Sequence, residues 1–486
     1  MLFNSLQFII FYPIIVFIYF LIPFRYRWIL LLAGSYYFYM VWKPIYVILL
    51  LISTLLDYFA AIQMSKHQTR EKRRIYLLLS LFGNLGLLFF YKYFNFIAEA
   101  LNNTLLFLPF ELKIPFHNLL LPVGISFYTF QTLAYTIDVY RGKIAAERHL
   151  GYFALYVSYF PQLVAGPIER SESLLPQLHQ HFFFDRKRTS YGLKLMIWGF
   201  FKKIVIADNL AIMVEQVYST PNAYSAIFFI IATVFFAYQI YCDFSGYSDI
   251  AKGAALIMGI ELMDNFHSPY GATSIGDFWG KWHISLSTWF RDYLYIPLGG
   301  NRVNEVRHLF NIFIVFLVSG IWHGANWTFF VWGLYHGACI ITSHLISAIG
   351  NKITLLPKNM QSHPIYKIWQ MFLTFILVCI GWVFFRANTI SDAFYILKSV
   401  FLNNSLSHTP FTTIWAQLPL PTYILSPLCV IIIVLHIIHM RAKSDNIVEI
   451  LHGRPAWIRW PVYYMIMFFI LFLGQYDQAN FIYFQF

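Results

Sequence analysis

Long runs of apolar residues recur from one end of the chain to the other, with short polar segments between them. A helix needs roughly 20 such residues to cross a bilayer, and the runs do not alternate as the strands of a membrane β-barrel do. We therefore predict an all-α polytopic membrane protein with about eleven transmembrane helices. The candidate spans are residues 6–23, 26–42, 45–63, 75–94, 119–139, 150–166, 193–206, 223–242, 308–321, 326–349, 366–385, 422–440 and 459–475.

A few apolar segments are too short, or too interrupted by glycine and proline, to cross a bilayer alone. Residues 157–167 and 249–259 are two examples. Such segments are tolerated as re-entrant or buried helices where protein surrounds them. The chain shows no internal repeat and no long hydrophilic segment. We predict a single transmembrane domain over residues 1–486.

The distribution of charged residues predicts how the chain is oriented in the membrane. Charged residues make up 12% of the chain, well below the roughly 25% of soluble domains. The net charge of +12 arises from lysines and arginines in short loops, and their bias toward the cytoplasm explains this charge better than nucleic-acid binding does. The loop at residues 66–74 holds five basic residues, which predicts a cytoplasmic loop and an extracytoplasmic N-terminus.

The cysteines give no sign of a disulfide framework or a zinc site. The four of them, Cys242, Cys339, Cys379 and Cys429, lie in apolar segments, and none forms a CxxC pair. Each is expected to pack as a small hydrophobic side chain, and we predict no metal site.

The segment at residues 319–327 (SGIWHGANW) places a titratable imidazole, His323, inside apolar surroundings. A group that can carry charge is costly at membrane depth and often marks a pathway or a reacting centre. The alternative is a hydrogen-bonded core histidine. The preceding Ser-Gly pair, Asn326 three residues later and a second imidazole at His283 favour the functional interpretation.

Residues 277–293 form a polar and aromatic block just before this segment. In a helix, Asp277 and Lys281 would pair at i,i+4, and His283, Ser287 and Arg291 would share another face. The alternative is an amphipathic interfacial helix whose charges are neutralised and whose tryptophans anchor it at the headgroups. Asp243 and Asp249 are two carboxylates six residues apart in the sequence DFSGYSD, at residues 243–249, which follows an apolar run.

These motifs make the chain resemble the membrane-bound O-acyltransferase (MBOAT) family, over nearly its whole length. The similarity is strongest to the bacterial AlgI/PatA-like branch, the membrane subunits of alginate and peptidoglycan O-acetylation. It rests on PVGISFYTF (122–130), VAGPI (164–168), DFSGYSD (243–249), residues 279–293, WHG (322–324) and the final FIYFQF (481–486).

The resemblance implies a ring of helices around a central funnel in the cell (inner) membrane. It implies that His323 matches the family's near-invariant histidine and His283 the second catalytic-region residue. It further implies a cytoplasmic acyl thioester donor, acetyl-CoA or another, with no bound cofactor. The acyl group would pass to an AlgJ-, AlgX- or PatB-like extracytoplasmic partner, which esterifies a polysaccharide.

We expect His323 to act as the general base, because a hydroxyl is a poor nucleophile until a positioned base takes its proton. His283 and Asn326 are candidate donors to the oxyanion, and Ser287, Arg291 and Asp243 are further substrate or oxyanion candidates. Three alternatives stay open at this point. They are a D-alanyl transfer protein of teichoic-acid type, a polysaccharide or acyl transporter without chemistry, and a structural scaffold for an export complex.

Overall fold

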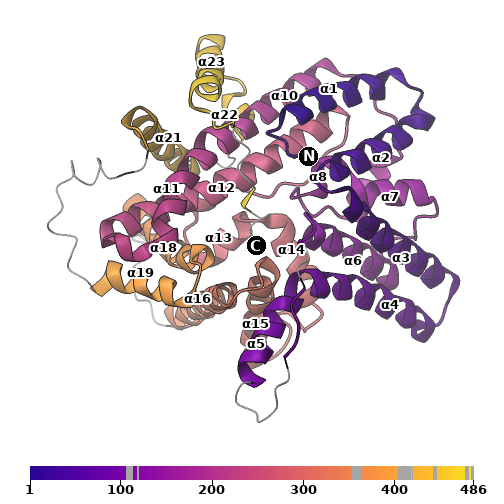
Figure 1. The fold of residues 1–486 in the computed structure, drawn as a ribbon, viewed down its shortest axis with the longest axis horizontal. Helices are drawn as coiled ribbons and strands as arrows, with labels where there is room; N and C mark the ends of the chain where they lie inside the picture. Colours follow the sequence, from indigo (N-terminus) through magenta and orange to yellow (C-terminus); the bar gives the residue numbers. More distant parts are fainter. Residues whose placement is uncertain are drawn as a thin grey trace. The chain divides into compact units, whose positions relative to one another are not determined.

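The computed structural model describes the chain except residues 106–112, 118–119, 353–362, 403–417, 419, 442–445, 477–480 and 483–486. The end of the FIYFQF motif therefore lies outside the described residues. Throughout the described part the regular structure is helical, and extended pairing there is limited to one isolated bridge, between Phe266 and Trp282. The predicted all-α class is thus confirmed. The described residues group into two compact units, residues 1–196 with 250–263, and residues 197–249 with 264–486 (Figure 1).

Eight helical stretches in the described part of the chain are long and apolar enough to cross a membrane. They comprise Pro44–Lys66, Arg70–Leu105, α12 (Ala226–Ile257), α15 (Glu305–His323), the Trp327–Ser347 part of α16 (Trp327–Lys352), α18 (Pro364–Arg386), α21 (Thr422–Arg441) and α23 (Ala456–Leu473). A shorter apolar helix, α1 (Leu6–Leu21), precedes them. Multi-pass insertion in a membrane follows from these helices.

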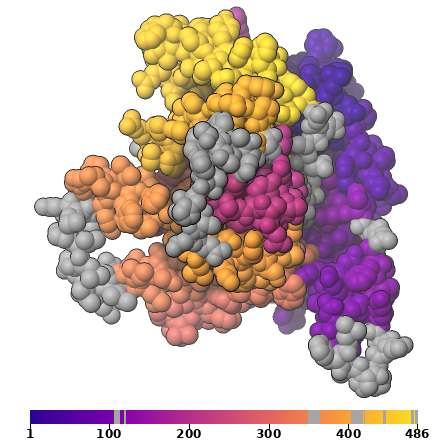
Figure 2. Space-filling view, turned by 60° about the vertical axis from the view of Figure 1, so that its left-hand side comes forward, coloured from indigo at the N-terminus to yellow at the C-terminus, as the bar shows by residue number. Residues whose placement is uncertain are grey.

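The outer surfaces of these helices are apolar, as contact with lipid requires. The helix α23, drawn in yellow at the surface in Figure 2, is almost wholly exposed: only 6% of its most apolar stretch is buried, and Trp457, Tyr464 and Phe472 are exposed. The helix α12 is the opposite case, because 72% of its most apolar stretch is buried inside the protein. Residues 249–257 form the last part of α12, which ends at Ile257, and most of them are buried. Of the two predicted alternatives for residues 249–259, the structure therefore shows a buried helical segment, continuous with the preceding span.

The first unit is built from α1, α2 (Phe24–Met40), α3 (Val47–Lys66), α4 (Arg70–Leu88), α5 (Phe94–Leu105), α6 (Ile125–Arg141), α7 (Leu150–Ser158), α8 (Phe160–Leu163) and α9 (Ser171–Leu178). Its helices α3, α4 and α6 pack on one another around a buried carboxylate, Asp57. Ser80 Oγ donates to Asp57 at 2.5 Å and Asn84 Nδ2 donates at 2.8 Å. A carboxylate this deep is tolerated because neighbouring helices supply its hydrogen bonds.

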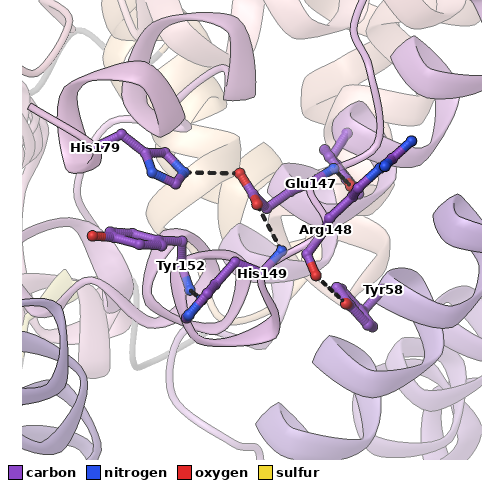
Figure 3. A network of polar contacts seen from close by, with 7 residues as sticks. Tyr58, Glu147, Arg148, His149, Tyr152 and His179 are labelled. Carbon is purple, nitrogen blue, oxygen red and sulfur yellow. Dashed lines mark hydrogen bonds and ion pairs between the residues drawn. The ribbon is translucent and has the colours of Figure 1, made fainter.

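A second polar network fixes the loop between α6 and α7 in the same unit (Figure 3). The carboxylate of Glu147 accepts from the His149 amide at 2.8 Å and lies 2.9 Å from Nε2 of His179, just beyond α9. Tyr58 of α3 donates to the carbonyl of Arg148 at 2.5 Å. These contacts tie the loop to α3 and to the end of α9, and the Nδ1 atom of His149 caps α7 by accepting from Tyr152.

The second unit contains α11 (Asp208–Ser219), α12 as far as Asp249, α13 (Ile275–Lys281), α14 (Ile284–Phe290), α15, α16, α18, α19 (Ile390–Leu402), α21, α22 (Ile447–Leu451) and α23. Before α11, the end of α10 (Arg186–Phe200) leads into a π-helical segment, Phe201–Ala207. The most extensively packed helix pair of the second unit is α15 and α16, which form an αα-hairpin (Figure 1). His323 is the last residue of α15 and lies where the two helices are joined.

Two glycines allow α15 and α16 to approach so closely. A Cβ atom at Gly320 would lie 2.4 Å from the carbonyl oxygen of Phe329, and one at Gly333 would lie 2.5 Å from that of Phe316. Both neighbours are backbone atoms that cannot rotate away. Small residues at such crossings are the usual means of close helix packing in membranes.

Gly320→Ala is therefore expected to force the hairpin apart and to destabilise the protein by about 1–3 kcal/mol, the usual cost of overpacking. Thermal unfolding of the detergent-solubilised protein would measure the change. Gly86→Ala in α4 is the matched control, because its Cβ would meet nothing within 4 Å. That control should be neutral or stabilising by up to about 1 kcal/mol. Equal effects of the two substitutions would contradict the close-packing account.

Candidate active site

His323 is the last residue of α15, and its side chain is buried. Its Nδ1 atom lies 2.6 Å from the carbonyl oxygen of Ser319, one turn earlier. A carbonyl oxygen can only accept a hydrogen bond, so Nδ1 must carry the proton. In the neutral ring, Nε2 is then the basic nitrogen, which is the tautomer that a general base acting through Nε2 needs. The helix therefore sets the tautomer of His323.

His283 lies between α13 and α14 and is fully buried. Its backbone is left-handed, with φ 46° and ψ 53°, a conformation that costs a residue other than glycine about 1–3 kcal/mol. Residues 277–290 therefore form two helices that meet at this histidine, and the single helical face with Ser287 and Arg291 does not form. Burial, and after it the nearby His323, holds the pKa of His283 well below its usual range, so the ring is neutral at neutral pH.

The structure brings the two predicted histidines together. The ring centroids of His283 and His323 are 6.4 Å apart, and the rings are inclined by 77°. Trp322 contacts both, with centroid distances of 4.9 Å to His323 and 6.0 Å to His283. Trp332, at 4.8 Å from His323, closes another side. The two imidazoles thus share a buried, aromatic site in which electrostatic interactions are stronger than in water.

A buried asparagine absent from the predictions, Asn265, holds the backbone at His283. Its Oδ1 accepts from Ser285 Oγ at 2.6 Å, its Nδ2 donates to Ser248 Oγ at 3.1 Å, and its carbonyl accepts from the Ile284 amide at 2.9 Å. The adjacent bridge between Phe266 and Trp282 extends this pairing past the histidine. No periodic pattern in the sequence singles out Asn265, because it lies in a loop. Its side-chain partners Ser248 and Ser285 are 17 and 20 residues away along the chain.

Asn265→Ala is expected to lower the free energy of unfolding by about 1–3 kcal/mol, because it removes the side-chain hydrogen bonds with the hydroxyls of the buried Ser285 and Ser248. Thermal unfolding in detergent would measure this. The control is Asn222→Ala, at an exposed position, which should stay within about 0.5 kcal/mol of the parent. If Asn265→Ala lowered the free energy of unfolding no more than Asn222→Ala does, the hydrogen bonds of Asn265 would not stabilise the backbone at His283.

Asp243 lies on α12 within a buried ion cluster. Its Oδ1 atom is 2.7 Å from Nζ of Lys203, which also lies 2.7 Å from Asp208 Oδ1, and its Oδ2 accepts from the Ile482 amide at 2.7 Å. The preceding Lys202 pairs with Asp249 at 2.7 Å. Both lysines belong to the π-helical segment, so the carboxylates of the DFSGYSD motif anchor α12 to it.

Two further residues of the DFSGYSD motif connect these ion pairs with the histidine site. The ring of Phe244, next to Asp243, meets the ring of His283 edge-on at 4.6 Å. A Cβ atom at Gly246 would lie 2.8 Å from the carbonyl oxygen of Gly199, so glycine permits the close crossing of α12 over the end of α10. Asp243 thus positions Phe244 against a site histidine, while its own carboxylate is engaged by Lys203.

The other predicted site residues make hydrogen bonds and ion pairs with residues other than the two histidines. Ser287 Oγ donates to the Trp282 carbonyl at 3.3 Å, and the exposed Arg291 pairs with Asp292 at 2.8 Å. Asn326 is exposed and caps α16, accepting from the Thr328 amide at 3.0 Å and donating to the Asn388 carbonyl at 3.3 Å. Their roles toward substrate stay predictions.

Two smaller predictions are confirmed by the geometry. Lys281 Nζ lies 2.9 Å from Asp277 Oδ2, the expected i,i+4 pair on α13. No disulfide links the four cysteines, all of which lie in the described part of the chain, as their spacing indicated.

The sequence matches the model of a known family over most of its length. Residues 41–385 match MBOAT, the membrane-bound O-acyltransferase family, and this range contains both histidines and Asp243. The chain is 40% identical over 399 residues to the "Probable alginate O-acetylase AlgI" of Pseudomonas putida, covering 81% of this chain and 79% of that protein. It is 35% identical over 403 residues to the "Peptidoglycan O-acetyltransferase" of Helicobacter pylori, covering 78% and 74%.

A more distant similarity involves the "Teichoic acid D-alanyltransferase" of Bacillus subtilis, at 28% identity over 291 residues, covering 56% of this chain and 71% of that protein. The family model, the two O-acetylating relatives and the membrane-spanning helices agree with one another. The chain is therefore an acyltransferase and belongs to the membrane-bound O-acyltransferase family.

Proposed function

We propose that the protein is an O-acetyltransferase that moves an acetyl group from a cytoplasmic thioester toward hydroxyls of an extracytoplasmic polysaccharide, through a partner protein of AlgJ, AlgX or PatB type. The observation that carries this proposal is the buried pair of His323 and His283, with the proton of the neutral His323 ring placed on Nδ1 by the Ser319 carbonyl. Relatives named for alginate and peptidoglycan O-acetylation support the acceptor class.

We assign to the two histidines the direct transfer of the acetyl group from the thioester to the acceptor hydroxyl, without an acyl-enzyme intermediate. Nε2 of His323 removes the proton of the acceptor hydroxyl as its oxygen attacks the thioester carbonyl. The new C–O bond forms, the tetrahedral intermediate collapses, the C–S bond breaks, and the thiolate takes the proton back from His323. His283 is held neutral by burial, so one ring nitrogen carries a proton that can be donated to the oxyanion. No resident cofactor takes part in this scheme.

An assay with the purified protein in detergent, its partner, and labelled acetyl-CoA or an acetylated carrier protein tests the proposal. Free thiol should be released, and labelled ester formed on the acceptor, only when His323 is present. Transfer from a D-alanyl carrier protein but not from acetyl donors would support the teichoic-acid alternative. A transporter would be supported instead if no donor released free thiol and the polymer crossed the membrane of vesicles that contain the protein.

The lysine and arginine bias of the loops predicts that the N-terminus lies outside and residues 66–74 lie inside, and we propose this orientation. Thr69→Cys should then react with a membrane-impermeant maleimide only after the cytoplasmic face is opened, and Lys113→Cys should react in intact cells. The native cysteines lie in apolar segments and give the background in the parent protein. Labelling of Thr69→Cys in intact cells would overturn this orientation.

A further inference from the structure

The α15–α16 hairpin carries a second cluster of imidazoles at the end opposite His323. Glu305 and His308 lie in the first turn of α15, and His344 lies toward the end of α16. Their side-chain donor atoms all lie within 4.8 Å of one another, with His344 Nε2 only 2.8 Å from Glu305 Oε1. The rings of His308 and His344 meet at 5.1 Å, inclined by 85°.

His344 and Glu305 form an ion pair, and the ring of His308 packs against those of His344 and Tyr295. A divalent cation could be bound by the lone pairs of both imidazoles and by the carboxylate at the same time. Glu305 and His308 are three residues apart on one helix face, and His344 approaches from the facing helix. The set thus offers two nitrogens and one carboxylate oxygen from two rigid elements.

This donor set fits zinc and similar transition metals. Imidazole nitrogen and carboxylate oxygen bind Zn²⁺ at about 2.0–2.2 Å, which places neighbouring ligand atoms about 3.4 Å apart in a tetrahedral site. The ligand atoms of the three side chains now lie within 4.8 Å of one another, and small side-chain rotations of the exposed Glu305 and the half-buried histidines would bring them to about 3.4 Å. Mg²⁺ and Ca²⁺ prefer oxygen ligands, and a single carboxylate among two imidazoles serves them poorly.

We propose that Glu305, His308 and His344 form a binding site for one divalent transition-metal ion, with Zn²⁺ as the preferred occupant. Three protein ligands leave a coordination position for water. The ion clamps the start of α15 to α16. A 19-residue helix rises about 28 Å, so this clamp lies at the far end of α15 from His323. Its role is to stabilise the hairpin, and it does not depend on the acyl-transfer proposal.

Calorimetric titration with Zn²⁺ tests the site, on full-length protein purified without a polyhistidine tag and treated with a chelator. We expect one saturable site and a higher unfolding temperature with Zn²⁺. His308→Ala and His344→Ala should each weaken binding by at least about ten-fold, the lower end of what even outer-shell changes cost. Co²⁺ should give a visible absorption spectrum of nitrogen and oxygen ligation that both variants lose.

His452→Ala, at an exposed histidine outside the cluster, is the matched control and should bind Zn²⁺ as the parent does. Glu305→Gln keeps the shape of the side chain and removes its charge, so a weaker but measurable affinity is expected for it. The absence of saturable Zn²⁺ binding by the parent would overturn the proposal. Unchanged affinity in both histidine variants would overturn it as well, because the ion would then bind elsewhere.

Discussion

Replacing His323 by alanine is expected to lower the rate of acyl transfer by about 10²–10⁴-fold while the protein stays folded in the membrane. The size follows from the loss of a positioned base, since the acceptor hydroxyl then has only water to take its proton. The labelled-thioester assay would give the rate of ester formation, and acetyl ester on the extracellular polymer would give the effect in cells.

His323→Gln separates the base from the packing. The glutamine amide can still donate to the Ser319 carbonyl and fill much of the same space, but it has no basic nitrogen. If His323 acts as a base, the glutamine variant should be nearly as inactive as the alanine variant, with an unfolding temperature close to that of the parent. A glutamine variant with substantial activity would show that the imidazole serves only to hold the hairpin tip, and would reject the mechanism.

Much of this site could be predicted from the sequence, because its main signals are local. The histidine in WHG is conspicuous in an apolar run, and Asp277 and Lys281 pair within one helical turn. The all-α class follows from the length of the apolar runs alone. Such features depend on neighbours a few residues away, which a helical period brings together.

The features that could not be predicted depend on distant parts of the chain. The left-handed backbone of His283 contradicts its helical pattern, and it persists because Asn265 and the bridge at Phe266 hold both sides of it. The continuation of α12 through residues 249–257 is stabilised by burial rather than by propensity. Tertiary contacts therefore override the local pattern where the candidate site is formed.

Lys203→Met is expected to destabilise the protein by about 3–5 kcal/mol, the cost of leaving buried carboxylates without their cation. Asp208 and Asp243 both lie 2.7 Å from this ammonium, and all three side chains are buried. Chemical or thermal unfolding in detergent would measure the loss. Lys281→Met is the matched control, because its pair with Asp277 is about one third exposed and should be worth at most about 1 kcal/mol.

A triple variant, Lys203→Met with Asp208→Asn and Asp243→Asn, distinguishes structure from chemistry in this cluster. Removing all three charges together should recover much of the stability, since no unpaired charge then remains buried. If Asp243 acts only by positioning Phe244 against His283, transfer should recover in parallel with stability. Recovered stability without transfer would instead show that the charge of Asp243 acts on the reaction itself. A triple variant no more stable than Lys203→Met would contradict the view that unpaired carboxylates cause the loss.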